Sequence, residues 1–214
     1  VRWAAARTLG NLAVQRGAEG ETAFGGGDRA SRAVRGIADL LTDQDLAVRV
    51  AGATALEHMG KAAHPPTKDG SAGPPRAPFF RAACQATPRL IASINRSQTE
   101  AARFIYPSRE TEPDLVKGDP SIRIAAMRAV EAIEGGDQDC GDRGQALREA
   151  VVALGDGNAQ VRQAGADMIG RMGRGADKEL RQELVEALGK ASADPISDVR
   201  RAVSGALLSL MRSK

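Results

Sequence analysis

Apolar and polar residues follow a helical period along much of this chain, and one pattern recurs in five places. Counted from its first residue as position 0, the pattern has Val or Ile at 0, Arg at 1, a small residue at 3, and large apolar residues at 8 and 11. The apolar positions fall on one stripe of an α-helix, so each copy predicts an amphipathic helix. The copies begin at Val1, Val48, Ile122, Val161 and Val199.

The same periodicity places further helices between the copies. Polar residues at 42–45 are expected to cap the helix that follows them, and Pro88 is expected to kink or split the helix around it. In the first helix, the predicted buried face comprises Val1, Ala4, Ala5, Thr8, Leu9 and Leu12. The predicted helices span 1–14, 31–41, 46–62, 79–94, 120–134, 145–154, 159–172, 178–188 and 196–211, with a short one at 100–105.

Three segments interrupt the pattern. The stretch near 16–30 is rich in glycine, 64–78 is rich in proline and glycine, and 95–118 is polar. Loops of this length often take part in binding, so we expect them to supply additional contacts.

The starts of the copies are 47, 74, 39 and 38 residues apart, which indicates a unit of about 40 residues. Two interpretations fit the long interval. A degenerate unit lies between the second and third copies, or 79–94 is the first helix of an ordinary unit that carries an insertion. The second interpretation is slightly favoured.

The five copies, preceded by acids at Asp45, Asp119, Asp156 and either Asp194 or Asp198, resemble HEAT repeats. They are similar to the short, Ala-rich kind that also occurs in phycobilin-lyase-like proteins, and the resemblance covers roughly 160 residues. It implies an all-α fold: a right-handed α-solenoid of antiparallel helical hairpins, with about five units in one domain over 1–214. The first unit is incomplete, because Val1 aligns with the start of the second helix of a unit and no partner helix precedes it, so we expect the chain to be a fragment of a longer protein.

Composition agrees with helices packed through small aliphatic side chains, since 42% of residues are hydrophobic and only 3% are aromatic. No run of 18 apolar residues occurs, so no transmembrane segment is expected. Cys84 and Cys140 lie far apart in the sequence and are expected to be reduced thiols. We therefore expect an intracellular protein and predict no particular compartment.

No residue set in the chain identifies a reaction. The two histidines, His58 and His64, are not followed by Glu, no Cys-x-x-Cys occurs, and the glycine-rich stretch 170–178 lacks the ending of a phosphate loop. We predict no enzyme, and no catalytic, cofactor-binding or metal-binding residue.

The arginine at position 1 recurs in every copy. It would form a basic ladder for an acidic ligand, or it would pair with the acid of an inter-helix turn in its own unit or the next. We favour the structural role for these five residues: Arg2, Arg49, Arg123, Arg162 and Arg200.

Positions 2, 6, 10 and 13 of each copy face away from the stripe and are expected to lie on the concave surface that repeat proteins use for binding. They include an apolar row at position 2 in the first three copies and a dispersed basic set. The candidate partner-binding residues are Trp3, Arg7, Val50, Thr54, Ile124, Arg128, Gln163, Arg171, Arg174 and Arg201.

The sequence thus favours a non-catalytic scaffold or adaptor, an accessory subunit of a larger assembly that binds other proteins. One alternative, implied by the resemblance, is a phycobilin-lyase-like assembly factor that holds a tetrapyrrole or a client in its groove. A second alternative is a nucleic-acid-binding array. The net charge of only +3, with both signs interspersed, argues against nucleic acid.

Overall fold

The computed structural model describes residues 1–17, 27–63, 82–95, 119–134 and 140–212. These residues form helices and turns and contain no β-strand. Short 3-10 turns occupy Leu40–Thr42 and Gly173–Gly175. The α-helices are α1 (Arg2–Gly17), α2 (Gly27–Asp39), α3 (Leu46–Ala63), α5 (Thr87–Ile94), α7 (Pro120–Glu134), α8 (Arg143–Ala153), α9 (Ala159–Met172), α10 (Lys178–Ala191) and α11 (Ser197–Met211).

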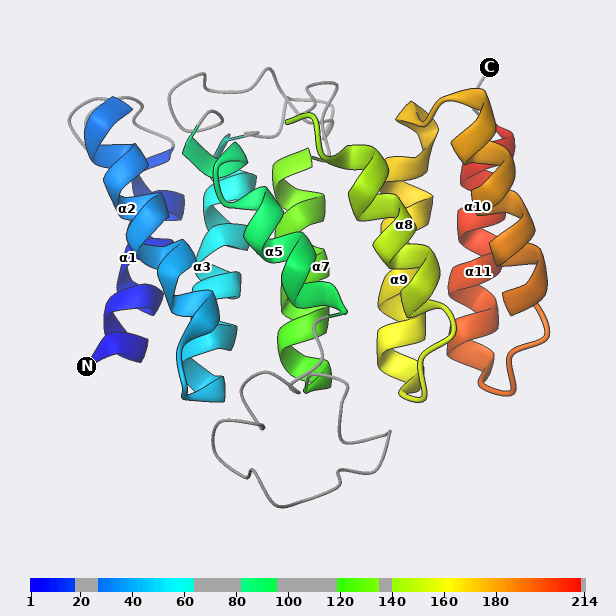
Figure 1. Cartoon of the computed structure of the whole chain (residues 1–214), viewed down its shortest axis with the longest axis horizontal. Coiled ribbons are helices and arrows are strands. Elements are labelled where there is room, and N and C mark those ends of the chain that lie inside the picture. The colour runs from blue at the N-terminus through cyan, green and yellow to red at the C-terminus, as the bar shows by residue number, and fades with distance from the viewer. Residues whose placement is uncertain (18–26, 64–81, 96–118, 135–139, 213–214) are drawn as a thin grey trace.

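The helices stand in two parallel layers (Figure 1). Helices α1, α3, α7, α9 and α11 carry the repeated pattern and pack one on the next, and we call them the motif layer. The second layer contains α2, α5, α8 and α10, each packed against the motif-layer helix that follows it. From hairpin to hairpin, the chain follows a right-handed superhelical path (Figure 1). The predicted all-α solenoid of antiparallel hairpins is confirmed.

The long interval between the second and third copies contains an ordinary unit. Helix α7 packs directly on both α3 and α5, so no further hairpin separates α3 from α7. The favoured interpretation, a first helix followed by an insertion, is therefore correct. The helix is also split as expected: residues 82–84 are helical, 85–86 form a turn, and α5 restarts with Pro88 in its first turn. Proline is tolerated there because the N–H it lacks would have no helical partner.

Helices α7 and α9 have the predicted bounds, whereas α2 begins at Gly27, four residues before its predicted start. Residues 16–17 belong to α1 and 27–30 to α2, so the first interruption is shorter than expected. Helix α10 continues through Gly189 to Ala191. Gly27 in α2 and Gly189 in α10 are both helical, because the cost of about 1 kcal/mol of placing glycine in a helix is not enough to end it. The segment 64–78, nearly all of 95–118 and the short helix at 100–105 lie outside the described residues.

The core is a continuous aliphatic cluster between the two layers. Pattern positions 8 and 11 supply much of it, including Leu56, Met59, Ile133 and Ile169, all with no exposed surface. Removing several buried methyl groups at one of these positions costs about 2–5 kcal/mol.

The predicted face of α1 is partly wrong. Val1, Ala4, Ala5 and Thr8 are exposed, and Ala6 and Gly10 are buried instead. This difference follows from packing, because α1 rests on α3 within the motif layer and its buried side is the one that meets α3.

Glycines set the closest approaches between motif-layer helices. A Cβ on Gly60 would lie 2.8 Å from the carbonyl carbon of Ala132, which belongs to α7. A Cβ on Gly170 would lie 3.0 Å from the Cα of Ala206 in α11. At pattern position 3, Ala51 and Ala125 are buried, Ala164 and Ala202 are half-buried, and Ala4 is exposed.

Cys84 and Cys140 form a disulfide, with their Cα atoms 5.3 Å apart. The expectation of two reduced thiols is wrong. The two cysteines lie on the segments that lead into α5 and α8, which are neighbours in the second layer. This contact joins residues that are far apart in the sequence, so the sequence did not reveal it. None of the described helices is long and apolar enough to cross a bilayer.

Candidate functional site

The pattern arginines lie at one end of the hairpins, against the turns. The Nε and Nη2 atoms of Arg162 donate to the carboxylate of Asp194 at 2.6 and 3.0 Å. Its Nη1 donates to the carbonyls of Asp156 and Gly157 at 2.8 and 3.2 Å. Arg162 therefore closes its own turn and holds the turn of the next unit.

Other copies share parts of this arrangement. Arg2 pairs with Asp43 at 3.2 Å, one unit further on. Arg49 donates to the carbonyl of Asp43 at 2.7 Å, and Arg200 to that of Asp194 at 2.7 Å. Each acid of the arrangement stands six residues before a pattern arginine: Asp43, Asp156 and Asp194.

Two acids that the sequence associated with the arginines serve a different purpose. Asp45 accepts a hydrogen bond from the backbone N–H of Ala47, and Asp119 accepts one from Ser121, both at 2.8 Å. These carboxylates cap helix N-termini, as expected for residues 42–45. Of the two alternatives in the last unit, Asp194 meets Arg162, and Asp198 pairs with Arg201 in its own helix at 2.8 Å.

Arg123 is the most deeply buried of the five and shows how the insertion is accommodated. Its Nη1 binds Asp156 at 2.5 Å, and both side chains are about 5% exposed or less. Its Nε donates to the Ile94 carbonyl at 2.5 Å and its Nη2 to Asn95 at 2.9 Å. The end of α5 thus supplies the acceptors that a short turn supplies in the other units.

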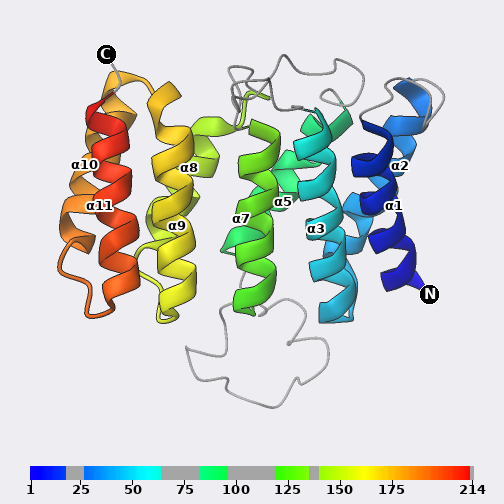
Figure 2. The same cartoon turned by 180° about the vertical axis from the view of Figure 1, so that it is seen from behind.

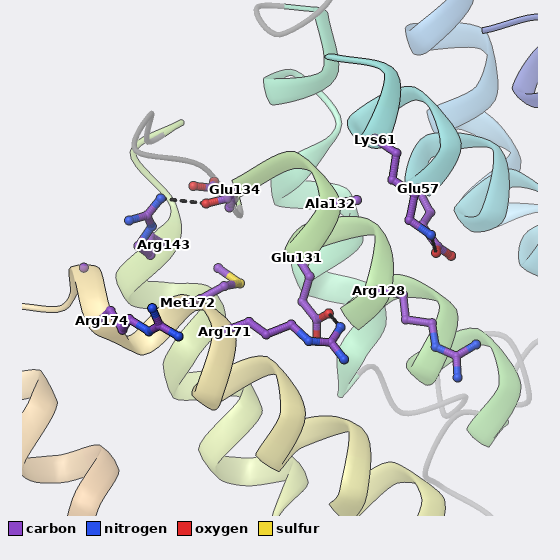
Figure 3. A pocket seen from close by; sticks show the side chains of 11 residues that line it. Glu57, Lys61, Arg128, Glu131, Ala132, Glu134, Arg143, Arg171, Met172 and Arg174 are labelled. Carbon is purple, nitrogen blue, oxygen red and sulfur yellow. Dashed lines mark hydrogen bonds and ion pairs between the residues drawn. The ribbon is translucent and has the colours of Figure 1, made fainter. Parts of the chain in front are cut away.

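A groove crosses the exposed side of the motif layer, which faces the viewer in Figure 2. Its central hollow of about 570 Å³ is lined by α3, α7 and α9. A hollow of about 870 Å³ adjoins it (Figure 3), and one of about 560 Å³ continues it to α11. Eight of the ten predicted partner-binding residues line these hollows: Val50, Thr54, Ile124, Arg128, Gln163, Arg171, Arg174 and Arg201.

The remaining two, Trp3 and Arg7, are not among the residues that line the groove. Both belong to α1, where the Arg7 guanidinium lies over the Trp3 ring, 5.3 Å from its centre. Trp3 is 44% exposed. The structure therefore joins Val50 and Ile124 in one hollow and leaves Trp3 apart from it.

The central hollow is lined by three carboxylates, Glu57, Glu131 and Asp167. Glu57 pairs with Lys61 at 2.5 Å, and Glu131 pairs with Arg171 of the next motif-layer helix. Asp167 lies close enough to Arg128 and Arg171 for both charges to lower its pKa. The sequence showed charges of both signs interspersed and assigned these acids no role. The signal that it missed is Glu at pattern position 9 in two adjacent copies.

Burial dominates the protonation of Glu131 and Asp167. Desolvation raises the pKa of Glu131 from 4.5 to about 7, although the charge and hydrogen bond of Arg171 oppose the shift. Asp167 and Glu57 add smaller raising effects through their negative charge. Desolvation also raises the pKa of Asp167, against Arg171 and Arg128. The floor of the groove is therefore less negative at neutral pH than its composition indicates.

Within the described residues, no three His, Cys, Asp or Glu side chains gather as a metal site. No protein-family model matches the chain, and no curated protein matches it.

Among solved structures, the chain is similar to an engineered protein from a structural genomics consortium, with 18% identity and a TM-score of 0.43 over 97% of this chain and 89% of that one. It is also similar to a designed armadillo repeat protein in complex with the peptide (KR)4, with 19% identity and a TM-score of 0.37 over 96% and 91% of the two chains. Computationally designed armadillo repeat proteins for modular peptide recognition give 16% identity and a TM-score of 0.37 over 95% and 91%. Similarity at this level says nothing about what this chain binds.

Proposed function

We propose that this chain is a non-catalytic, HEAT-like scaffold that binds a segment of another protein along the groove of the motif layer. The observation that carries the proposal is the continuity of the groove. The two larger hollows share Glu57, Arg128, Glu131 and Arg171, and the central hollow shares Gln163, Asp167 and Arg171 with the one at α11. One ligand would therefore contact four successive helices.

The dimensions suit an extended polypeptide. Packed helices lie about 9 Å apart, so the path from α3 to α11 is about 27 Å long. An extended segment of about eight residues covers that distance at about 3.4 Å per residue. Side chains of alternate residues would meet the groove, where the lining offers apolar groups at Val50 and Ile124 and amide groups at Gln160 and Gln163.

The scaffold role implies a larger assembly, and we propose that the chain is an accessory subunit of one. The expected intracellular location relied on reduced thiols, and the Cys84–Cys140 disulfide removes that support. Disulfides persist mainly in oxidising compartments, so we propose that the chain functions in one. Thiol alkylation of the native protein without prior reduction tests this, because labelling at both cysteines would contradict it.

The scaffold role is tested by filling the groove. Cross-linking mass spectrometry in native extract would first identify the neighbouring protein. Binding of that purified neighbour is then compared between the unmodified chain, Gln163→Trp in the groove and Gln182→Trp. Gln182 is an exposed residue of α10 in the second layer and is a matched control. We expect Gln163→Trp alone to lose binding; equal binding by both folded variants would refute a groove-bound partner.

A further inference from the structure

In two ion pairs of the groove, the basic side chain is exposed and the acidic side chain is largely buried. In the Lys61–Glu57 pair, the Lys side chain is 62% exposed and the Glu side chain 15%. In the Arg171–Glu131 pair, the corresponding values are 63% and 9%. In both pairs the carboxylate is withdrawn into the floor while the cation reaches the solvent.

Other cations extend this exposed rim. Arg128 and Arg174 are exposed and line the largest hollow together with Lys61 and Arg171 (Figure 3). Arg174 is steadied by a hydrogen bond from its Nε to the Ser209 hydroxyl of α11 at 3.0 Å. The rim therefore receives cations from α3, α7, α9 and the turn after α9.

Exposed cations also border the α11 end of the groove, but one acid there, Asp198, is exposed as well. Arg201 and Arg212 are exposed at the border of that hollow, and Asp198, which pairs with Arg201, is 59% exposed. In the centre of the groove Glu131 loses part of its negative charge at neutral pH, because desolvation raises its pKa to about 7, and desolvation also raises the pKa of the half-buried Asp167. A ligand entering from solvent therefore meets a positive surface, and bases also outnumber acids in the lining.

We propose that the groove selects an extended protein segment whose acidic side chains reach Arg128, Arg171 and Arg174. This inference rests on the proposed scaffold function and adds the chemistry of the partner. Carboxylates form charge-assisted hydrogen bonds with guanidinium groups, and cations that are already positioned lose little freedom on binding.

A polypeptide fits this groove better than a nucleic acid does. A nucleic acid carries a charge on every nucleotide, whereas the cations of the rim come from separate helices, with the less exposed carboxylates of Glu57 and Asp167 between them. Val50 and Ile124 border the central hollow and offer contact to an apolar side chain between two acidic ones. A segment with spaced acids and intervening apolar residues matches both features.

The test uses the disulfide-bonded chain and three fluorescent peptides of about ten residues, slightly longer than the path along the groove requires. One alternates Glu with Ala, one Gln with Ala and one Lys with Ala. Fluorescence anisotropy measures binding to the unmodified chain, Arg128→Ala, Arg174→Ala and Arg148→Ala. Arg148→Ala is the control, because Arg148 lies on α8 in the second layer and its side chain is 62% exposed, and Arg128 and Arg174 are exposed as well. Arg171 is left intact because its removal would leave Glu131 buried without its ion-pair partner.

We expect the Glu peptide to bind best, with a Kd about tenfold larger in Arg128→Ala or Arg174→Ala and unchanged in Arg148→Ala. Circular dichroism checks that each variant is folded. The acidic preference is overturned if the Lys or Gln peptide binds as tightly, or if no groove arginine affects the Glu peptide. An oligothymidine that binds more tightly than the Glu peptide also overturns it.

These outcomes are separate from a failure of the scaffold role. If Gln163→Trp abolishes binding of the natural neighbour but the Lys peptide binds more tightly than the Glu peptide, the scaffold role is supported and the acidic preference is refuted. If Gln163→Trp leaves the neighbour bound, the scaffold role falls whichever peptide is preferred.

Discussion

Arg162 and Asp194 lie 32 residues apart in the sequence and form a two-point contact between adjacent units, with N–O distances of 2.6 and 3.0 Å. The hydrogen bond from Arg162 is the largest of the effects that lower the pKa of Asp194. Arg123 and Asp156 make the equivalent contact one unit earlier. Since units of a solenoid contact only their neighbours, such contacts fix how each hairpin sits on the next.

Asp156→Ala is expected to destabilise the fold strongly. The change leaves the buried Arg123 guanidinium without its carboxylate, and breaking one side of a buried ion pair costs about 3–5 kcal/mol. Asp198→Ala removes an exposed partner of Arg201 and should cost about 0–1 kcal/mol. Urea denaturation followed by circular dichroism measures both free energies of unfolding. Similar losses for the two variants would show that the Arg123 contact does not stabilise the array.

Gly60→Ala and Gly205→Ala are expected to act in opposite directions. A methyl group on Gly60 would contact the α7 backbone at 2.8 Å and push α3 away from it, at a cost of about 1–3 kcal/mol. Gly205 has no neighbouring atom within 4 Å of an added Cβ. Alanine there should stabilise α11 by about 0.5–1 kcal/mol. Thermal unfolding of the two variants tests the close helix contact, and an unchanged Tm in Gly60→Ala would contradict it.

Loss of the disulfide is expected to lower stability by about 2–4 kcal/mol, because the bond restricts the unfolded chain across 56 residues of sequence. Urea denaturation with and without a phosphine reductant measures the loss. The double variant Cys84→Ser with Cys140→Ser is the control and should be insensitive to reductant. Identical curves for the oxidised and reduced chain would mean that the bond adds nothing to the fold.

Glu131→Gln is expected to remove part of the dependence of stability on pH. The folded-state pKa of about 7 lies above the ordinary value of 4.5. Between these values the folded state therefore binds more protons than the unfolded state. The stability of the unmodified chain should fall as pH rises through this window, and level off above about 7.

The measurement compares free energies of unfolding at pH 5 and pH 8. Relative to the unmodified chain, Glu131→Gln should be more stable at pH 8 than at pH 5 by on the order of 2 kcal/mol. Glu179→Gln, at an exposed site in the first turn of α10, is the control. A Glu131→Gln variant with the unmodified pH profile would show that this carboxylate is not held in an unfavourable charged state.

The repeated pattern alone determined the helices of this protein and their pairing. A helix needs only a local period and end signals, so α7 and α9 have the bounds that the sequence predicts. The arginine and its turn acid were also visible, although the spacing did not reveal that Asp43 pairs with Arg2 while Asp45 caps a helix.

Tertiary structure decided the features that join distant parts of the chain. The contact between Cys84 and Cys140 depends on α5 and α8 being neighbours in space. The positive rim of the groove depends on depth: Glu131 and Arg171 both belong to the lining, but only the arginine reaches solvent. Sequence spacing reports which residues share a helix face. Burial, and with it the charge that a partner meets, is set by how the helices pack.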